Sequence, residues 1–499
     1  MHQEGCRGKR HVIIFAPGLN YGGNAVIFGL YFLIPASFML RIPASAVVLL
    51  LAPAALAQQF IGSNNSTAPG IRQVPYNPAW TAAADDGTEI HLFSASGLAG
   101  TNAYRFSKGY VTNGFSGRAA EGKDYFKDLR TAAKHIWGNT DVLGPAVSFR
   151  INEEASAGFY TRVREVVRGG NIGSGAFRLI GDNSNIPAGK PVSFKNAGFT
   201  THTFSEIGFS YGRILNDDYY HILRGGFNLK YVMGMAAGSI YTEEATIVKH
   251  TPDSINSLKG DLQVSYSDNI RPFTDPDINN DLSSWFNRNG RGGLGLDFGL
   301  QYEYHPDGDP NRKTPYQYSI AVSVTDIGAV RYRADTGSAQ YVMRVQDVSA
   351  TQYVKPPQES YLNYFDRLIT DSLVTRKSET KDFSVSLPMA FRLNFDWNMG
   401  SHLYLQTNIL LNLKGSNGGI YNPGYVSMLN ITPRYERRYF SVALPFTYIG
   451  YQTLTLGAAI HIGPFFAGSS SLISTLWSKQ VRTVDGYAGI CLKLTSSRD

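Results

Sequence analysis

The sequence is poor in cysteine, in charge and in long apolar runs. The two cysteines, Cys6 and Cys491, stand at opposite ends of the chain, which excludes a disulfide scaffold and a cysteine metal site. Charged residues make up 17% of the chain, against about 25% in an average globular protein. Mean hydropathy is nevertheless only -0.18, too low for a bundle of membrane helices. What remains is a large chain of 499 residues, rich in Gly, Tyr and Phe, that favours strands.

The first 57 residues read as a leader rather than as part of the fold. Residues 39–57 contain Arg41, an apolar run and an A-x-A site, which predicts a secretory signal peptide cleaved after Ala57. We interpret residues 1–38 as a spurious upstream extension; the alternative is a membrane anchor. Removing the leader takes away four basic residues and one acidic residue, so the net charge falls from +7 to +4. The apparent basicity therefore gives no support to nucleic-acid binding, and none is expected.

After residue 57 no run approaches the roughly 18 apolar residues of a spanning helix, but segments of about ten residues alternate between apolar and polar. A soluble sandwich also alternates in this way. The apolar sets here are long, with aromatic residues such as Tyr302 and Tyr304 near segment ends, which favours a lipid-facing surface with an aromatic girdle. The clearest sets are Leu223, Phe227, Leu229 and Tyr231; Leu294, Leu296, Phe298 and Leu300; and Phe383, Val385, Leu387, Phe391 and Phe395.

In lipid, strands satisfy their backbone groups only as a closed barrel. Tight polar turns, as at 152–154 and 397–401, alternate with long connections, as at 168–204, 236–292 and 334–381. We therefore predict an all-β fold, a closed antiparallel transmembrane barrel of about 14 strands (12–16) over residues 88–494, with long extracellular loops and a tail at 495–499. An even strand count requires an extra reversal, which we place at Gly463-Pro464.

Several short motifs resemble a known family. In chain order they are Tyr76-Asn77-Pro78-Ala79, Asp141-Val142-Leu143-Gly144-Pro145, Thr161-Arg162-Val163-Arg164, Gly293-Leu294-Gly295-Leu296-Asp297-Phe298-Gly299, Val324-Thr325-Asp326-Ile327-Gly328 and Ile462-Gly463-Pro464-Phe465. Together they resemble an uncharacterised outer-membrane barrel family of Bacteroidota, which is similar to PorV and FadL-like barrels. The resemblance implies a fourteen-stranded barrel in the outer membrane of a Gram-negative bacterium, with an N-terminal segment folded into the lumen. It implies no chemistry.

Placing the apolar sets toward lipid places a set of charged residues in the lumen. Six basic residues against three acidic ones would draw in anionic solutes, such as the carboxylate of an amphipathic ligand. The interpretation that we favour is that these charges pair across neighbouring strands or with a plug. Residues 58–87, with the turn Asn77-Pro78, are the plug candidate; the alternative for them is a periplasmic tail. The predicted lumen-lining residues are Arg150, Arg162, Arg164, Glu206, Arg224, Lys230, Asp297, Glu303 and Arg392.

Two stretches, 125–137 and 360–369, have helical spacing of apolar residues. Each is expected to cap a loop onto the barrel, or alternatively to dock a surface partner. The acidic segment 275–281 resembles a calcium loop but lacks its glycine and its final glutamate, so we interpret it as a solvated outer loop. No catalytic motif, cofactor motif or metal spacing is present, so we expect no enzyme activity.

These observations lead to two functional hypotheses. The first is passive, FadL-like uptake of a small amphipathic or hydrophobic solute. The second is a non-transporting scaffold that binds a surface or secretion partner through its long loops, above all residues 334–381. Outer-membrane lipid is the expected partner in both. A third hypothesis, an outer-membrane hydrolase, lacks a visible triad.

Overall fold

The computed structural model describes residues 70–83, 88–115, 119–130, 132–181, 188–251, 253–270, 292–308, 315–353, 356, 359, 361–414, 421–437, 440–450 and 453–494. The predicted leader, most of the predicted plug, the acidic segment 275–281 and the C-terminal tail lie outside these ranges. No helix in the described ranges is both long and apolar enough to cross a membrane.

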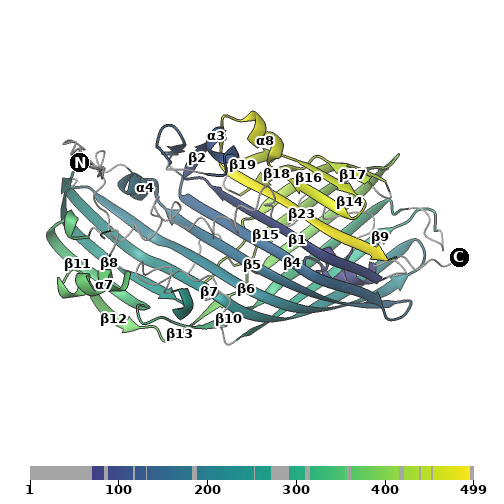
Figure 1. Cartoon of the computed structure of the whole chain (residues 1–499), viewed down its shortest axis with the longest axis horizontal. Coiled ribbons are helices and arrows are strands. Elements are labelled where there is room, and N and C mark those ends of the chain that lie inside the picture. Colours follow the sequence, from purple (N-terminus) through teal and green to yellow (C-terminus); the bar gives the residue numbers. More distant parts are fainter. Residues whose placement is uncertain are drawn as a thin grey trace, which may run out of the picture.

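Fourteen antiparallel strand positions form one closed barrel, as predicted (Figure 1). Ala95 pairs with Val142 on one side and with Ala488 on the other, so the first strand closes the sheet against the last. Three positions are each built from two consecutive pieces. In order the positions are β1 (Thr88–Thr101), β4 (Lys134–Arg150), β5 (Ala155–Ile172), β6 (Pro191–Asp217), β7 (His221–Thr251), β9 (Gly293–Tyr304), β10 (Tyr318–Arg333), β13 and β14 (Asp382–Ser386, Ala390–Gly400), β15 (Leu403–Asn412), β16 (Met428–Arg437), β17 and β18 (Phe440–Ala443, Phe446–Ile449), β19 and β20 (Thr453–Leu456, Ala458–Ile462), β21 (Phe465–Ser469) and β23 (Thr483–Leu494).

The side chains alternate between the outer wall and the lumen, as the period of two predicts. Leu229 is 44% exposed and Phe298 51% exposed on the outer wall, whereas the neighbouring Lys230 and Asp297 are fully buried. At one end of the barrel, the ring of Tyr318 contacts the rings of Tyr302 and Tyr304. An apolar belt that ends in aromatic residues is the outer surface of a membrane barrel.

The segment predicted as one strand over 383–395 is two strands, and the prediction is wrong for its first half. Phe383, Val385 and Leu387 are buried inside the barrel instead of facing lipid. The strand breaks around Pro388, which lacks a backbone N–H. Before the break the odd-numbered residues face the inside of the barrel; after it the even-numbered residues do, so Arg392 points into the lumen. Alternation in the sequence does not reveal such a change, because apolar residues occupy the odd positions in both halves.

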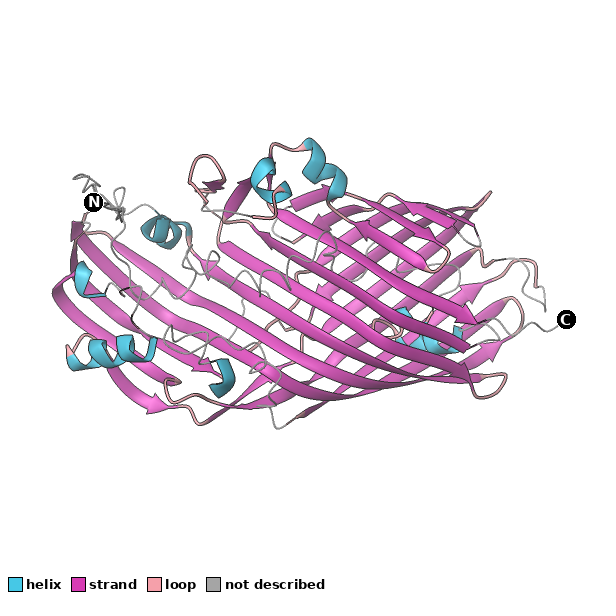
Figure 2. Ribbon diagram, in the orientation of Figure 1, coloured by secondary structure: helices cyan, strands magenta, loops and turns pink. Residues whose placement is uncertain are grey.

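Two of the barrel strands are far longer than a membrane crossing requires. β6 has 27 residues and β7 has 31, whereas a spanning strand needs roughly ten. The additional residues form a folded extension at one end of the barrel, which we call the extension end (Figure 2). The opposite end, with short turns such as Gly463-Pro464, is the turn end. The predicted long loops 168–204, 236–292 and 334–381 are therefore partly wrong: much of each is regular structure.

The extension is a small sheet with its own apolar core. β7 pairs with β8 (Ser254–Tyr266), β8 with β11 (Ala339–Ser349), and β11 with β12 (Thr375–Glu379). Helices α4 (Ser174–Gly181) and α7 (Tyr361–Thr370) pack on it, and the rings of Tyr341 and Phe365 stack with centroids 4.3 Å apart. The predicted helix 360–369 is thus confirmed as α7. Burial of Lys249 within the extension lowers its pKa to about 8, although Asp253 acts in the opposite direction.

A second small unit, the rim cap, stands on the extension-end side of β1, β4 and β23. It contains β2 (Tyr104–Ser107), β3 (Tyr125–Lys127) and β22 (Gln480–Val481), with helices α3 (Lys108–Thr112) and α8 (Leu472–Trp477). The predicted helix 125–137 is wrong: its first residues form β3 and its last enter β4, where strand pairing overrides the helical spacing. Three single 3-10 turns, η2 (Ile71–Gln73), η5 (Asp268–Ile270) and η6 (Ala350–Tyr353), and the longer η3 (Pro78–Ala83) complete the described elements.

The rim cap is joined to the barrel through Asp128. Its carboxylate accepts hydrogen bonds from Arg130 and contacts Arg482 and Lys134. Burial alone would raise the pKa of Asp128, but the hydrogen bonds from Arg130 and the charges of Lys134 and Arg482 outweigh it and lower the pKa to about 2.

Candidate functional site

A short N-terminal segment, residues 70–83, lies inside the barrel and is here called the lumen segment. Its backbone accepts hydrogen bonds from the wall: Asn228 Nδ2 donates to the Val74 carbonyl (3.0 Å) and Ser323 Oγ to the Tyr76 carbonyl (2.7 Å). Asn77 is fully buried, and its Nδ2 donates to the carbonyls of Leu300 (3.3 Å) and Val322 (3.2 Å). The structure thus places Asn77 and Pro78 at the centre of the lumen, where the turn of η3 begins.

The wall makes room for this segment with glycines on its inward face. A Cβ on Gly226 would lie 2.5 Å from the carbonyl carbon of Pro78, and one on Gly212 would lie 2.6 Å from the backbone nitrogen of Ala82. At Gly299 a Cβ would overlap Oδ1 of Asn77. Backbone packs directly on backbone at Gly226 and Gly212, and the side chain of Asn77 packs on the backbone at Gly299, so glycine is required by close approach at all three positions.

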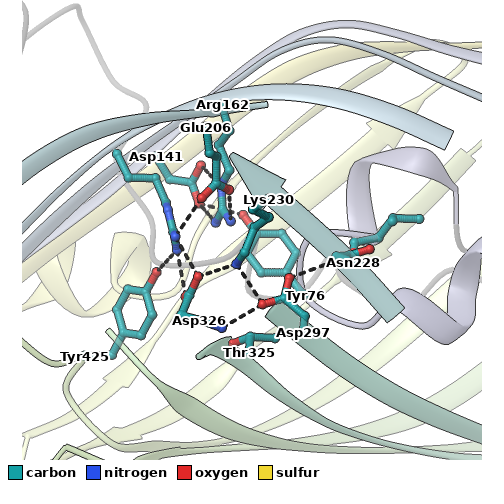
Figure 3. A network of polar contacts seen from close by, with 12 residues as sticks. Tyr76, Asp141, Arg162, Glu206, Asn228, Lys230, Asp297, Thr325, Asp326 and Tyr425 are labelled. Atoms are coloured by element: carbon teal, nitrogen blue, oxygen red, sulfur yellow. Dashed lines mark hydrogen bonds and ion pairs between the residues drawn. The ribbon is translucent and has the colours of Figure 1, made fainter. Parts of the chain in front are cut away.

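A network of paired charges crosses the lumen beside this segment (Figure 3). Arg162 on β5 is 3% exposed; its Nε donates to Asp141 Oδ1 of β4 at 2.7 Å and a terminal nitrogen reaches Glu206 Oε1 of β6 at 3.3 Å. The Tyr76 hydroxyl of the lumen segment donates to Asp141 at 2.8 Å, and the Tyr76 ring lies 4.8 Å from the Arg162 guanidinium carbon. The lumen segment is therefore part of the network.

The second half of the network centres on Asp326 of β10. Arg164 on β5 donates to both Asp326 oxygens (2.6 and 2.8 Å) and also contacts Glu206 at 2.9 Å. Lys230 of β7 lies 2.6 Å from Asp326 and 2.7 Å from Asp297 of β9. Removing one partner of such a buried pair leaves the other charge uncompensated, at a cost of about 3–5 kcal/mol.

The predicted excess of positive charge in the lumen is offset by two carboxylates that the prediction omitted, Asp141 and Asp326. With Glu206 and Asp297 they match the four cations of the centre one for one, and three of these cations are paired with carboxylates. The favoured interpretation, charges that pair across strands, describes this geometry, and Tyr76 of the lumen segment joins them through Asp141. No group of three or more His, Cys, Asp or Glu side chains within the described ranges is arranged to hold a metal ion.

The remaining predicted lumen residues lie apart from the central network. Arg224 and Glu303 form a buried pair 2.8 Å apart nearer the turn end, where His305 also reaches Glu303. Arg150 is exposed at the end of β4 and donates to two carbonyls of the adjoining turn, those of Asn152 and Glu153. Arg150 therefore belongs to the turn, because β4 ends there and its side chain folds back along the hairpin.

Two buried apolar clusters lie on the extension-end side of the charges. Phe204 and Val232 stand two residues beyond Glu206 and Lys230 on their strands, in the direction of the extension. The Trp137 cluster consists of Leu98, Trp137, Val166, Ala390, Leu410, Tyr425, Val426, Met428 and Ile449. The Tyr332 cluster consists of Phe204, Val232, Ala237, Val330, Tyr332, Phe383, Val385 and Leu387.

Sequence reasoning missed Asp141, Asp326, Tyr76 and Tyr425 as site residues. Tyr76, Asp141 and Asp326 stand in the motifs quoted above, so the sequence marked their positions but did not indicate what the side chains do. Tyr425 follows a long connection and belongs to no strand, and nothing in the sequence places it.

Structural comparisons find outer-membrane proteins at very low identity. A TodX deltaS2S3 mutant monoaromatic hydrocarbon channel aligns with 6% identity and a TM-score of 0.42, covering 89% of this chain and 97% of that one. A FadL homologue of Pseudomonas aeruginosa aligns with 10% identity and a TM-score of 0.38, covering 88% and 98%. The translocator domain of the autotransporter NalP from Neisseria meningitidis aligns with 6% identity and a TM-score of 0.30, covering 82% and 89%.

Comparison with sequences gives a more definite result. No curated protein matches the chain. A family model matches residues 90–470, which span the barrel from its first strand to its next to last. The chain belongs to DUF5723, a family of unknown function.

Proposed function

We propose that this outer-membrane barrel is a passive channel or carrier for a small amphipathic or hydrophobic solute, with the turn end periplasmic and the extension extracellular. One observation carries the proposal: two clusters of buried apolar side chains, the Trp137 and Tyr332 clusters, lie inside the barrel on the extension side of the charged network. A pore for hydrophilic solutes has a polar interior. Apolar walls with a few convergent polar groups are typical of small-molecule sites.

The lumen segment supports a gated route over an open one. It lies inside the barrel on the turn-end side, where it is buried, accepts hydrogen bonds from β7 and β10 and donates one to β9. A solute that enters between the apolar clusters would meet the charged network and this segment next. Passage to the periplasm therefore requires the segment to move.

Two predictions from the sequence remain predictions: the similarity to PorV-like barrels of Bacteroidota, and cleavage of the signal peptide after Ala57.

The experiment uses Trp137, which is 2% exposed inside the Trp137 cluster. The purified protein in lipid nanodiscs is titrated with 8-bromo-1-octanol, because bromine quenches tryptophan fluorescence on contact. Saturable quenching in the wild type that disappears in Trp137→Phe supports a lumen site for apolar molecules. Swelling of proteoliposomes in sucrose, without saturable quenching, would identify a hydrophilic pore instead and contradict the proposal.

The extension favours a second candidate, a scaffold for a surface partner. It is an ordered platform with its own core, which solute passage through the barrel does not require. Arg344 and Asp366 are exposed on it. Co-purification of one surface protein that is lost in the Arg344→Glu, Asp366→Lys double variant, with quenching of Trp137 unchanged, would assign binding to this platform.

A further inference from the structure

Arg392 differs from the other cations at the centre of the lumen. It lies on β14, is 5% exposed, and its Nε donates weakly to Thr325 Oγ1 at 3.4 Å. Within the described part of the chain, no carboxylate oxygen lies within ion-pair distance of its guanidinium, whereas Arg162, Arg164 and Lys230 each contact one or more. A buried charge without a counter-ion is costly, so this site is incomplete.

Two aromatic rings hold the guanidinium in place. Its central carbon lies 5.2 Å from the ring centroid of Tyr76, in the lumen segment, and 5.7 Å from that of Tyr425. Cation–π contacts of this kind orient a guanidinium but do not neutralise it. The terminal nitrogens, which no described residue engages, remain available for an anion.

The neighbours of Arg392 define what kind of anion fits. In the strand register it stands opposite Leu410, and Tyr425 and Ala390 are further members of the Trp137 cluster. One side of the site is therefore apolar and faces the extension end, and the other side is the ring of Tyr76. The site supplies one unpaired positive charge, and the planar guanidinium matches a carboxylate through two parallel hydrogen bonds.

We propose that Arg392 binds the carboxylate of a singly charged amphiphile, whose apolar tail lies in the Trp137 cluster toward the extension. This inference rests on the proposed function and names its substrate class. Because Tyr76 forms one wall of the site, the bound head group contacts the segment that must move for passage. Arg162, Arg164 and Lys230 do not share this role, since each is already paired with a carboxylate.

The test compares 8-bromooctanoate with 8-bromo-1-octanol, which differ in the charged head group alone. Quenching of Trp137 is titrated in nanodiscs for the wild type, Arg392→Gln and Arg392→Lys. We expect the wild type to bind the carboxylate at least tenfold more tightly than the alcohol. Arg392→Gln abolishes this preference and Arg392→Lys keeps part of it, while affinity for the alcohol is unchanged.

The control is Arg331→Gln, which removes one positive charge from β10 at a side chain that is 58% exposed. It leaves the preference intact, which separates a local site from a general effect of charge. An equal preference in wild type and Arg392→Gln would overturn the inference. If the alcohol binds and the carboxylate does not, only the inference fails; if neither quenches Trp137, the proposed function fails as well.

Thermal unfolding of Arg392→Gln distinguishes a binding site from a structural charge. Removing an uncompensated buried charge is expected to leave the unfolding midpoint unchanged or to raise it. Arg164→Gln, which breaks a paired charge, is expected to lower the midpoint. A lowered midpoint for Arg392→Gln would show that the fold depends on this guanidinium, and would likewise overturn the inference.

Discussion

The fit of the lumen segment against glycine gives the sharpest structural prediction. An added Cβ at Gly226 would lie 2.5 Å from the carbonyl carbon of Pro78 and 2.8 Å from the nitrogen of Ala79, where 3.4 Å or more is ordinary contact. Both neighbours are backbone, so Gly226→Ala must displace the segment by roughly 1 Å. Overpacking of this kind costs about 1–3 kcal/mol.

The displacement also breaks hydrogen bonds. The two bonds from Asn77 to the carbonyls of Leu300 and Val322 are already 3.3 and 3.2 Å long, so a further shift removes them. Each contributes about 0.5–1.5 kcal/mol, and the buried amide then lacks partners. The expected total is about 2–6 kcal/mol against the seated segment, enough to populate a displaced state.

Limited trypsin digestion in detergent measures that state, because Arg72 in the segment is 6% exposed and protected while the segment is seated. Gly226→Ala is expected to speed cleavage after Arg72 and to raise bilayer conductance. The matched control is Gly173→Ala, where an added Cβ has no atom within 4 Å. Equal protection of Arg72 in both variants and the wild type would refute the proposed fit.

Three further predictions concern the wall, the rim cap and the extension. Leu229→Arg places a charge on the lipid-facing wall and is expected to cost about 2–4 kcal/mol in guanidinium unfolding from vesicles. Since the pKa of Asp128 is lowered to about 2, its contribution to stability is complete above about pH 4 and is lost as the pH falls through 2; hydrogen exchange of β3 should rise over that window, and in Asp128→Asn at neutral pH. The lowered pKa of Lys249, about 8, means that stability increases as the pH rises from 8 toward 10.5, an increase that Lys249→Met should abolish in urea midpoints measured across that range.

The barrel could be predicted because lipid on one side and lumen on the other impose a period of two on the sequence. Strand β9 shows this alternation: Leu294 is exposed on the outer wall, whereas Asp297 is buried in the lumen. The same logic explains where prediction failed. The parts of β6 and β7 at the extension end lie beyond the membrane, so neither face of these strands has to be uniformly apolar. Residues 236–251 were therefore predicted to be a loop, although they pair with neighbouring strands.

The charges of the lumen were predictable by sign and position but not by partner. Partners come from strands far apart in sequence, as with Arg164 of β5 and Asp326 of β10, and only the register brings them together. A sequence read strand by strand therefore gives the sign of each charge it recognises but not its partner, and here it also missed the carboxylates of Asp141 and Asp326.

The two missed carboxylates share a physical reason. Asp326 has a positive φ of 65° at an irregularity between Val324 and Ile327, a conformation that Asp tolerates better than most residues. Its backbone N–H donates to Asp297 there, so the irregularity itself is built into the network. Asp141 lies just before the irregularity at 143–146 of β4. An irregularity of this kind reverses which residues of the strand face the lumen, so the alternation read on one side of it does not predict the facing of residues on the other side. Once both carboxylates are counted, the four cations and four carboxylates at the lumen centre balance, so the general excess of positive charge is gone and the carboxylate preference that we propose rests on the guanidinium of Arg392 alone.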